Sequence, residues 1–307
     1  MEIASGVYRL TLADSRGSDM VSGIVAEAAP GQFVNVYLNS ASMLLPRPFG
    51  ISDVVASERG PRLVLVYAVV GAGTAELSTY APGAAIRILG PQGNGYELAP
   101  LGKNVLLIGG GLGIPPLLFA TRRIRERLTP GDDTRLTALL GYRDAPYYSG
   151  GMGLYCDEVF SISETASGIG EYKKEHEHKK NRPFCVVNGT VMDLAARLVS
   201  DGRLDLTDAS ILSCGPMPML CAVAEWAKSK GIPAQVSLEA RMGCGYGACV
   251  GCTIEVKPAE PIASAANTKG TVLFVSPSDE SLTEHPSIAQ RKVCKDGPVF
   301  PAEAIVW

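Results

Sequence analysis

The sequence predicts a β barrel, then an α/β domain, then a small cysteine-bearing C-terminal domain, and three observations support this order. Residues 1–100 hold short segments rich in β-branched residues, separated by glycine and proline turns. Residues 101–236 alternate buried, strand-like apolar runs with helix-like runs. Residues 237–307 hold four of the eight cysteines, three of them in one glycine-rich stretch. A chain of 307 residues is long enough for two or three such domains.

The first hundred residues favour a closed antiparallel barrel, because the strand-like segments are short and regularly spaced. These segments are GVYRLTL, QFVNVYL, RLVLVYAVV and AAIRILG. The run RPFGIS places Arg47 at a barrel edge, where a guanidinium can pair with phosphate. Phe49 either lies against a flat ring or packs in the core. The turn GAGT at residues 71–74 precedes a short predicted helix and could hold a pyrophosphate.

The α/β domain opens with a strand, NVLLIGG, that runs into a glycine turn and a helix. The run GGGLGIPP at residues 109–116 therefore suits a nucleotide phosphate at a helix N-terminus, or else it is a tight turn without a ligand. Cys214 ends a later strand, ASILSCG, and ligands of parallel sheets bind at such strand ends. We expect a pocket thiol beside a nicotinamide, with a buried small residue as the alternative. Arg143 and Asp144 leave the choice between NAD and NADP open.

Two regions are predicted to be loops. Residues 145–182 include the charged run EYKKEHEHKKNR, which is typical of a solvated surface, so that metal binding by His176 and His178 is not expected. Residues 257–290, rich in serine, proline and alanine, are interpreted as an insertion within the cysteine-bearing domain.

The cysteines carry the most specific chemical signal. Cys244, Cys249 and Cys252 have C-x4-C-x2-C spacing, and Cys294 supplies a fourth thiol in the run KVCKDGPVF. This is the plant-type [2Fe–2S] pattern, and the surrounding glycines allow the backbone to wrap the cluster. A zinc site normally shows two C-x2-C pairs or paired histidines, and a disulfide framework suits small secreted chains. Both alternatives are therefore weaker, and the remaining cysteines are interpreted as core or pocket thiols.

Composition excludes several classes of function. The formal charge of −3 argues against a nucleic-acid partner, and no run of 18 apolar residues suggests a membrane span. The first residues show no basic start followed by an apolar block, so no secretory signal is expected. Eight cysteines in such a chain suggest a reducing, cytoplasmic location.

Taken in order, the motifs resemble the electron-transfer subunits of dihydroorotate dehydrogenase B complexes, within the ferredoxin–NADP reductase superfamily. The motifs are RPFGIS, GAGT, GPQGNGY, GGGLGIPPLL, CGPMPML, EARMGCGYGACVGC and KVCKDGPVF. The resemblance implies FAD on the barrel, NAD on the α/β domain and one [2Fe–2S] cluster in the tail. It also implies an FMN-containing catalytic partner that oxidises dihydroorotate to orotate in pyrimidine biosynthesis, in a heterotetramer.

The resemblance and the motifs together give a set of expected site residues. The expected cluster ligands are Cys244, Cys249, Cys252 and Cys294, and the expected catalytic residue is Cys214. The expected flavin contacts are Arg47, Pro48, Phe49, Gly50, Val66, Tyr67, Ala68, Gly73 and Thr74. The expected nicotinamide contacts are Gly109, Gly110, Gly111, Gly113, Ile114, Pro115, Gly215, Pro216 and Met217.

Two positions depart from the family pattern. Gly50 stands where the family has a serine, so a hydroxyl for the flavin is lost unless Ser52 or a backbone amide replaces it. Ala68 stands where the family has an arginine after an aromatic residue. These departures keep two other hypotheses open: a reductase subunit of a sulfide dehydrogenase or ferredoxin:NADP oxidoreductase type, and an assembly subunit that has lost a cofactor.

Overall fold

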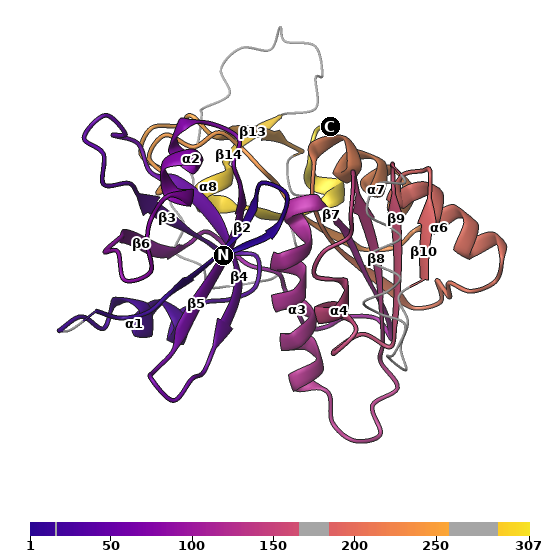
Figure 1. The fold of residues 1–307 in the computed structure, drawn as a ribbon. Helices are drawn as coiled ribbons and strands as arrows, with labels where there is room; N and C mark the ends of the chain where they lie inside the picture. Colours follow the sequence, from indigo (N-terminus) through magenta and orange to yellow (C-terminus); the bar gives the residue numbers. More distant parts are fainter. Residues whose placement is uncertain (16, 166–183, 258–287) are drawn as a thin grey trace, which may run out of the picture.

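A computed structural model describes residues 1–15, 17–165, 184–257 and 288–307. Figure 1 shows an N-terminal sheet on one side, an α/β unit on the other, and the C-terminal elements lying between them. The predicted order of a barrel-like unit, an α/β unit and a cysteine-bearing tail is thus present. His176, His178 and most of the predicted 257–290 insertion lie outside the described residues.

The N-terminal sheet is antiparallel, with strand order β1-β2-β5-β4-β3-β6. Its apolar side chains point inward at alternate positions, so that Val34, Val36, Ile51 and Leu65 form a fully buried core. The strands are β1 (Glu2–Ala4), β2 (Val7–Leu12), β3 (Phe33–Tyr37), β4 (Arg47–Val55), β5 (Arg62–Ala68) and β6 (Arg87–Gln92). Two helices, α1 (Met20–Glu27) and α2 (Ala72–Ser78), accompany them.

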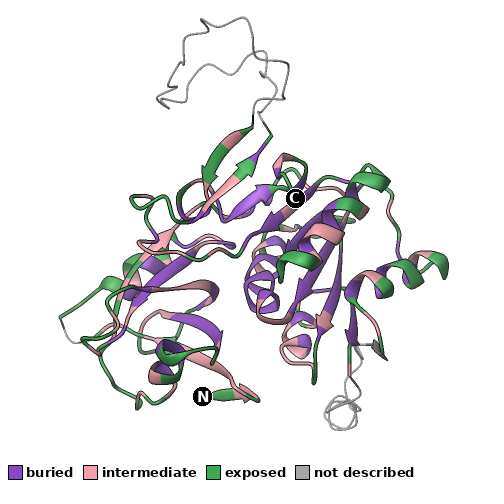
Figure 2. Ribbon diagram, turned by 90° about the horizontal axis from the view of Figure 1, so that it is seen from above, coloured by how far each residue is buried: buried purple, intermediate pink, exposed green. Residues whose placement is uncertain are grey.

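The second sheet has the order β10-β9-β8-β7-β11-β12-β15, and its first six strands are parallel. These strands are β7 (Asn104–Gly110), β8 (Arg135–Tyr142), β9 (Glu158–Ser163), β10 (Phe184–Val187), β11 (Ala209–Cys214) and β12 (Ala234–Ser237). The connecting helices are η1 (Gly111–Gly113), α3 (Ile114–Arg127), α4 (Ser149–Met152), α6 (Val191–Ser200) and α7 (Met217–Lys230). Figure 2 shows the strands buried between helices whose outer faces are exposed. Because the chain turns in opposite directions after β7 and after β11, their carboxyl ends form the switch point where such sheets bind ligands.

The prediction that residues 145–182 form one loop is wrong for its first half. Residues 149–152 form α4, and residues 158–163 form β9, which pairs in parallel with β8. Residues 159–163 of β9 are all buried. The buried Ser161 and Ser163 interrupt the apolar run, which is why the sequence pattern did not indicate a central strand.

The tail returns to both other units. Strands β13 (Thr253–Val256) and β14 (Ala289–Lys292) pair with each other, and α8 (Val293–Asp296) follows directly. Strand β15 (Val299–Pro301) then adds antiparallel to β12 at the edge of the α/β sheet, before η2 (Ala302–Ala304). The cysteine-bearing segments are therefore fixed against the sheet rather than hanging from it.

The barrel and the α/β unit meet where β4 packs on α3. Arg122 of α3 donates to Asp53 Oδ1 from Nη2 at 2.6 Å and from Nε at 3.1 Å, and to the Val54 carbonyl at 2.7 Å. Both charged side chains are largely shielded, with 17% and 24% of their surface exposed, so the contact orients the two units as well as joining them.

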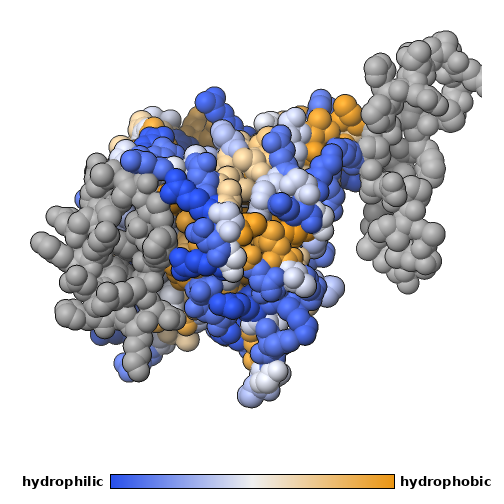
Figure 3. All heavy atoms as spheres, turned by 90° about the vertical axis from the view of Figure 1, so that its right-hand side faces the viewer, coloured by the Kyte–Doolittle hydropathy of each residue, from blue (hydrophilic) through white to orange (hydrophobic). Residues whose placement is uncertain are grey.

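None of the helices within the described residues is both long and apolar enough to cross a bilayer. On the face drawn in Figure 3, hydrophilic side chains surround and separate the apolar areas.

Candidate cofactor site

A cleft of about 280 Å³ lies where the barrel, the switch point and the tail meet. The barrel contributes β4 and β5, and the α/β unit contributes Leu112, Pro116 and Cys214. The end of β12 and the segment after it contribute Ser237 to Ala240. Cofactor-binding clefts commonly form at such junctions between units, because three surfaces can shape one concave wall.

The barrel wall of the cleft contains most of the residues expected to contact a flavin. Pro48, Phe49, Gly50, Val66, Tyr67, Ala68 and Thr74 all line it. The Phe49 ring lies 5.3 Å from the Tyr67 ring, which stacks on Tyr8 at 5.7 Å. Burial raises the pKa of Tyr67 to about 12, so its phenol stays neutral. This wall is apolar and aromatic, as a flat isoalloxazine ring requires.

Arg47 and Gly73, expected to hold the pyrophosphate of the flavin, lie together just beyond the cleft lining. A Cβ on Gly73 would come within 2.5 Å of Arg47 Nε, so only glycine lets the guanidinium approach this turn. Arg47 also donates from Nη1 to the Leu45 carbonyl at 2.7 Å. The Thr74 hydroxyl accepts from the backbone N–H groups of Val70 and Gly71, and thus caps its own helix. A cation beside a glycine turn suits an anionic ligand.

The glycine turn after β7 packs tightly against the turn after β11. A Cβ on Gly113 would overlap the carbonyl of Cys214, and Cβ atoms on Gly110 and Gly215 would each lie 2.6 Å from the Met219 side chain. Gly111 differs, since it has φ of +52° and open space around it. Three of these glycines thus serve packing between the turns, and Gly111 serves the backbone conformation.

The residues expected to contact nicotinamide are brought together at the switch point, but they do not line the cleft itself. No member of that set lines it; the cleft is lined instead by Cys214, the expected catalytic residue, and by the neighbouring Leu112 and Pro116. Ile114 is fully buried in the core, whereas Met217 is 41% exposed. The remaining members form the two adjoining turns: Gly109, Gly110, Gly111, Gly113, Pro115, Gly215 and Pro216.

Cys214 and Glu239 line the same cleft, and the Glu239 carboxyl acts on the Cys214 thiol. Burial and the nearby Glu239 carboxyl raise the pKa of the Cys214 thiol to about 12, so the thiol is neutral at ordinary pH. Glu239 is exposed at the cleft mouth, where surrounding protein atoms nevertheless raise the pKa of its carboxyl. Glu239 was not among the expected site residues, because it stands between an apolar strand and the cysteine motif and carries no spacing signal of its own.

The four expected cluster cysteines form two pairs. The Cys249 N–H donates to Cys244 Sγ at 3.4 Å, and the Cys294 N–H donates to Cys252 Sγ at 3.5 Å. Gly245 and Gly247 have positive φ, which turns the loop around the Cys244 sulfur. Cys249 is exposed, whereas Cys252 and Cys294 are buried.

The donor set fits a two-iron cluster, because each iron takes two thiolates and the four cysteines stand as two pairs. Backbone N–H groups of Tyr246 and Cys249 lower the pKa of Cys244 to about 6, whereas burial and the Cys252 thiol raise that of Cys294 to about 12. Iron ions, which bind the deprotonated form of a thiol, would stabilise all four cysteines as thiolates.

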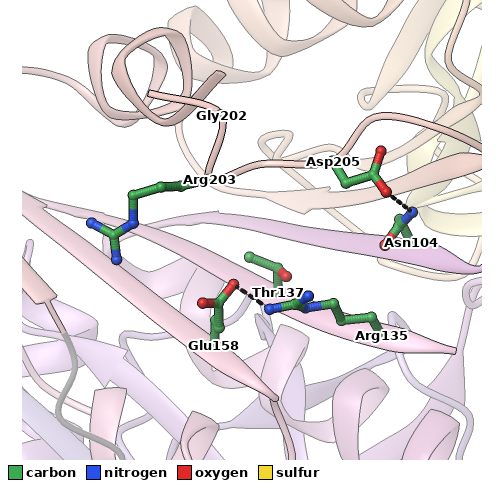
Figure 4. A pocket seen from close by; sticks show the side chains of 7 residues that line it. All are labelled: Asn104, Arg135, Thr137, Glu158, Gly202, Arg203 and Asp205. Atoms are coloured by element: carbon green, nitrogen blue, oxygen red, sulfur yellow. Dashed lines mark hydrogen bonds and ion pairs between the residues drawn. The ribbon is translucent and has the colours of Figure 1, made fainter. Parts of the chain in front are cut away.

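A second, polar pocket of about 240 Å³ lies at the other end of the α/β sheet, where β7, β8 and β9 begin. Figure 4 shows Arg135 paired with Glu158, at 3.0 Å, and Asn104 donating to Asp205, at 3.3 Å. Its charges are balanced and partly solvated, and it lies away from the strand ends that form the cleft.

The fold and the site define a class, since this arrangement of barrel, parallel sheet and junction cleft is the ferredoxin–NADP reductase fold. Over 74% of this chain and 87% of that protein, the structure resembles a ferredoxin NADP⁺ reductase from Neisseria gonorrhoeae with bound FAD and NADP, at TM-score 0.52 and 12% identity. A similar structure over the whole chain is that of an NADH-dependent reduced ferredoxin-NADP oxidoreductase, at TM-score 0.70, 24% identity and 87% of that chain. These likenesses confirm the predicted fold.

Sequence relatives narrow the class. Residues 239–265 match the family described as the iron-sulfur cluster binding domain of dihydroorotate dehydrogenase B. The chain is 30% identical over 309 residues to the dihydroorotate dehydrogenase B (NAD(+)) electron transfer subunit of Bacillus caldolyticus, covering 99% of this chain and 94% of that protein. The protein of the same name from Caldanaerobacter subterraneus subsp. tengcongensis is 29% identical over the same shares. The chain belongs to this family of electron transfer subunits, which confirms the resemblance seen in its motifs.

Proposed function

We propose that this chain is the electron-transfer subunit of a dihydroorotate dehydrogenase B, which passes electrons through a [2Fe–2S] cluster and FAD to NAD⁺. The proposal rests on one observation. In a chain of this family, the four expected cluster cysteines stand as two pairs close to an aromatic cleft. When bound, an iron–sulfur cluster supplies single-electron transfer, and a flavin combines two single electrons with a proton into one hydride. The chain's own contribution is therefore distance, orientation and electrostatics.

The residue roles follow from their positions. The cluster ligands are Cys244, Cys249, Cys252 and Cys294. The aromatic wall around Tyr67 orients the flavin ring, and Arg47 with the Gly73 turn neutralises its pyrophosphate. The two turns at the switch point shape the nicotinamide site. The neutral Cys214 thiol excludes water from the cleft without adding charge.

The domain limits proposed for these roles are residues 1–100 for flavin binding, 101–236 for NAD binding and 237–307 for the cluster. The return of β15 to β12 supports close mechanical coupling of the last two. Such coupling favours electron transfer, because the distance between redox groups then stays fixed.

The name of the relatives, electron transfer subunit, points to a catalytic partner. We propose that the partner is an FMN-containing dihydroorotate dehydrogenase subunit, assembled with this chain as a heterotetramer in the cytoplasm. Around the exposed Cys249, Tyr246 and Val250 are 54% and 58% exposed. An apolar rim beside the outermost cluster ligand suits docking of an electron donor.

A second candidate is a reductase subunit that serves a different dehydrogenase, of the sulfide dehydrogenase or ferredoxin:NADP oxidoreductase type. The observation that favours it is the chemistry of Gly50 and Ala68, both of which line the cleft without a hydroxyl or a cation. A Cβ on Gly50 would lie 3.2 Å from Pro116, so this position is closely packed against α3.

Isolation of the native complex tests both candidates. Anaerobically purified protein is expected to be red-brown, with flavin and iron–sulfur absorbance, and to yield NADH from dihydroorotate and NAD⁺ with its co-purifying partner. A partner that oxidises another substrate, with no turnover of dihydroorotate, would favour the second candidate. A folded, colourless chain without iron would contradict both.

A further inference from the structure

Strand β3 of the barrel turns two different faces to two different units. Val34 and Val36 point into the barrel core. Phe33, on the opposite face, packs in the same buried cluster as Cys252 and Cys294 of the tail. Asn35 is two positions further along and so shares the Phe33 face. The outer face of β3 therefore forms a floor beneath the cysteine segments.

Asn35 makes direct contact with the backbone of the cysteine loop. It is fully buried, and its Nδ2 donates to the Cys244 carbonyl at 3.2 Å across 209 positions of sequence. A Cβ on Gly245 would overlap the Asn35 carboxamide. Gly245 also has φ of +73°, so two independent demands require glycine there. The carboxamide and the loop are thus fitted to each other.

The carboxamide oxygen of Asn35, Oδ1, shows that this side chain does more than hold the loop in place. Its Oδ1 is buried and has no hydrogen-bond partner among the described residues. A buried amide oxygen without a partner is unfavourable and calls for a function or a ligand. Asn35 lies against the loop whose N–H groups, those of Tyr246 and Cys249, point at the Cys244 sulfur. The Asn35 carboxamide therefore contacts the loop that surrounds the Cys244 sulfur.

We propose that Asn35 is a positioning residue for electron transfer: it fixes the Cys244 side of the cluster site to the flavin-bearing barrel and so tunes the potential of the cluster. The inference rests on the proposed function. Groups that hold a metal ligand from outside typically change affinity or activity by about 10–100-fold when removed. Cluster potentials respond to nearby charge and to hydrogen bonds at the sulfurs.

The test compares three variants of the full-length protein, isolated anaerobically with its cofactors. Asn35→Ala removes the carboxamide, and Asn35→Asp keeps its shape but replaces the donor with a negative charge. Asn39→Ala is the matched control, because Asn39 also donates from Nδ2 to a barrel carbonyl, that of Ala85 at 3.0 Å, on an exposed loop. Each protein is assayed for iron content, the EPR spectrum of the dithionite-reduced cluster, its midpoint potential, and NADH-driven cluster reduction by stopped flow.

We expect both Asn35 variants to change the EPR line shape and to slow NADH-driven cluster reduction by about tenfold, with Asn35→Asp also shifting the midpoint potential to more negative values. Asn39→Ala should match wild type in every assay. Wild-type spectra, potential and rate in Asn35→Asp would overturn the inference, even if Asn35→Ala fails to fold. Failure of the proposed function looks different, because wild-type protein itself would then show no cluster signal.

Discussion

Two glycine-rich turns in this molecule use the same residue for different reasons. In the turn after β7, Gly113 has an ordinary backbone conformation, with φ of −76°, and is required by space, because the Cys214 carbonyl leaves no room for a Cβ. In the cysteine loop, Gly247 is required by conformation, with φ of +96°, and it meets only the flexible Lys295 side chain. Gly113 thus lets the first turn pack against its neighbour, and Gly247 gives the second turn the backbone conformation that wraps a ligand.

This difference explains why the two turns were predictable to different degrees. A wrapping loop needs fixed spacing of its thiols, so Cys244, Cys249 and Cys252 carry a specific pattern. A packing turn needs only small residues, and GGGLGIPP is compatible with a ligand or with none. The comparison of the two turns is tested first at a cysteine of the wrapping loop, where a substitution is expected to have the largest effect.

Replacing Cys252 by serine should abolish the cluster. Cys252 is 4% exposed and pairs with Cys294, and a serine oxygen is a poor replacement for a thiolate on iron. We expect loss of the EPR signal of the reduced cluster and of NADH-driven cluster reduction, with flavin absorbance retained. Cys221→Ser is the control, since Cys221 is a partly exposed free thiol in α7. An intact cluster signal in Cys252→Ser would refute the assigned ligand set.

The fold was more predictable than the site. The segments GVYRLTL, NVLLIGG and ASILSCG became β2, β7 and β11, because β-branched and apolar periodicity is a local property. β9 was not predicted, because its buried serines interrupt the apolar pattern by which a buried strand is recognised. Asn35 and Glu239 were missed for a different reason: their importance comes from contacts made only after folding, with Cys244 and Cys214 respectively. No spacing along the chain encodes such contacts.

Two alanine substitutions in the turn after β7 distinguish the effect of steric overlap from the effect of an unfavourable φ. Gly113→Ala places a methyl group on the Cys214 backbone, which cannot move aside, so we expect a loss of about 3 kcal/mol in the free energy of unfolding. In Gly111→Ala the new methyl group has open space, and only the φ of +52° is unfavourable for alanine. We therefore expect a loss of about 1 kcal/mol in the free energy of unfolding. Urea denaturation of the two variants measures both values. Equal losses would mean that the turns do not pack as described.

A smaller effect than that of Gly113→Ala is expected at Cys214, a buried thiol that lies outside the expected cluster ligands. Its pKa is raised in the folded protein to about 12 from the ordinary value of 9.0, so the unfolded chain releases the proton first as pH rises. The stability that this thiol contributes is complete below pH 9 and declines above it, by about 1.4 kcal/mol at pH 10. Cys214→Ala lacks this decline. The difference in unfolding free energy between wild type and Cys214→Ala should therefore fall by about that amount between pH 8 and pH 10, measured by urea denaturation in matched buffers. A difference that stays constant over this range would show that the thiol ionises as freely in the folded protein as in the unfolded chain, and that the cleft does not exclude water from Cys214.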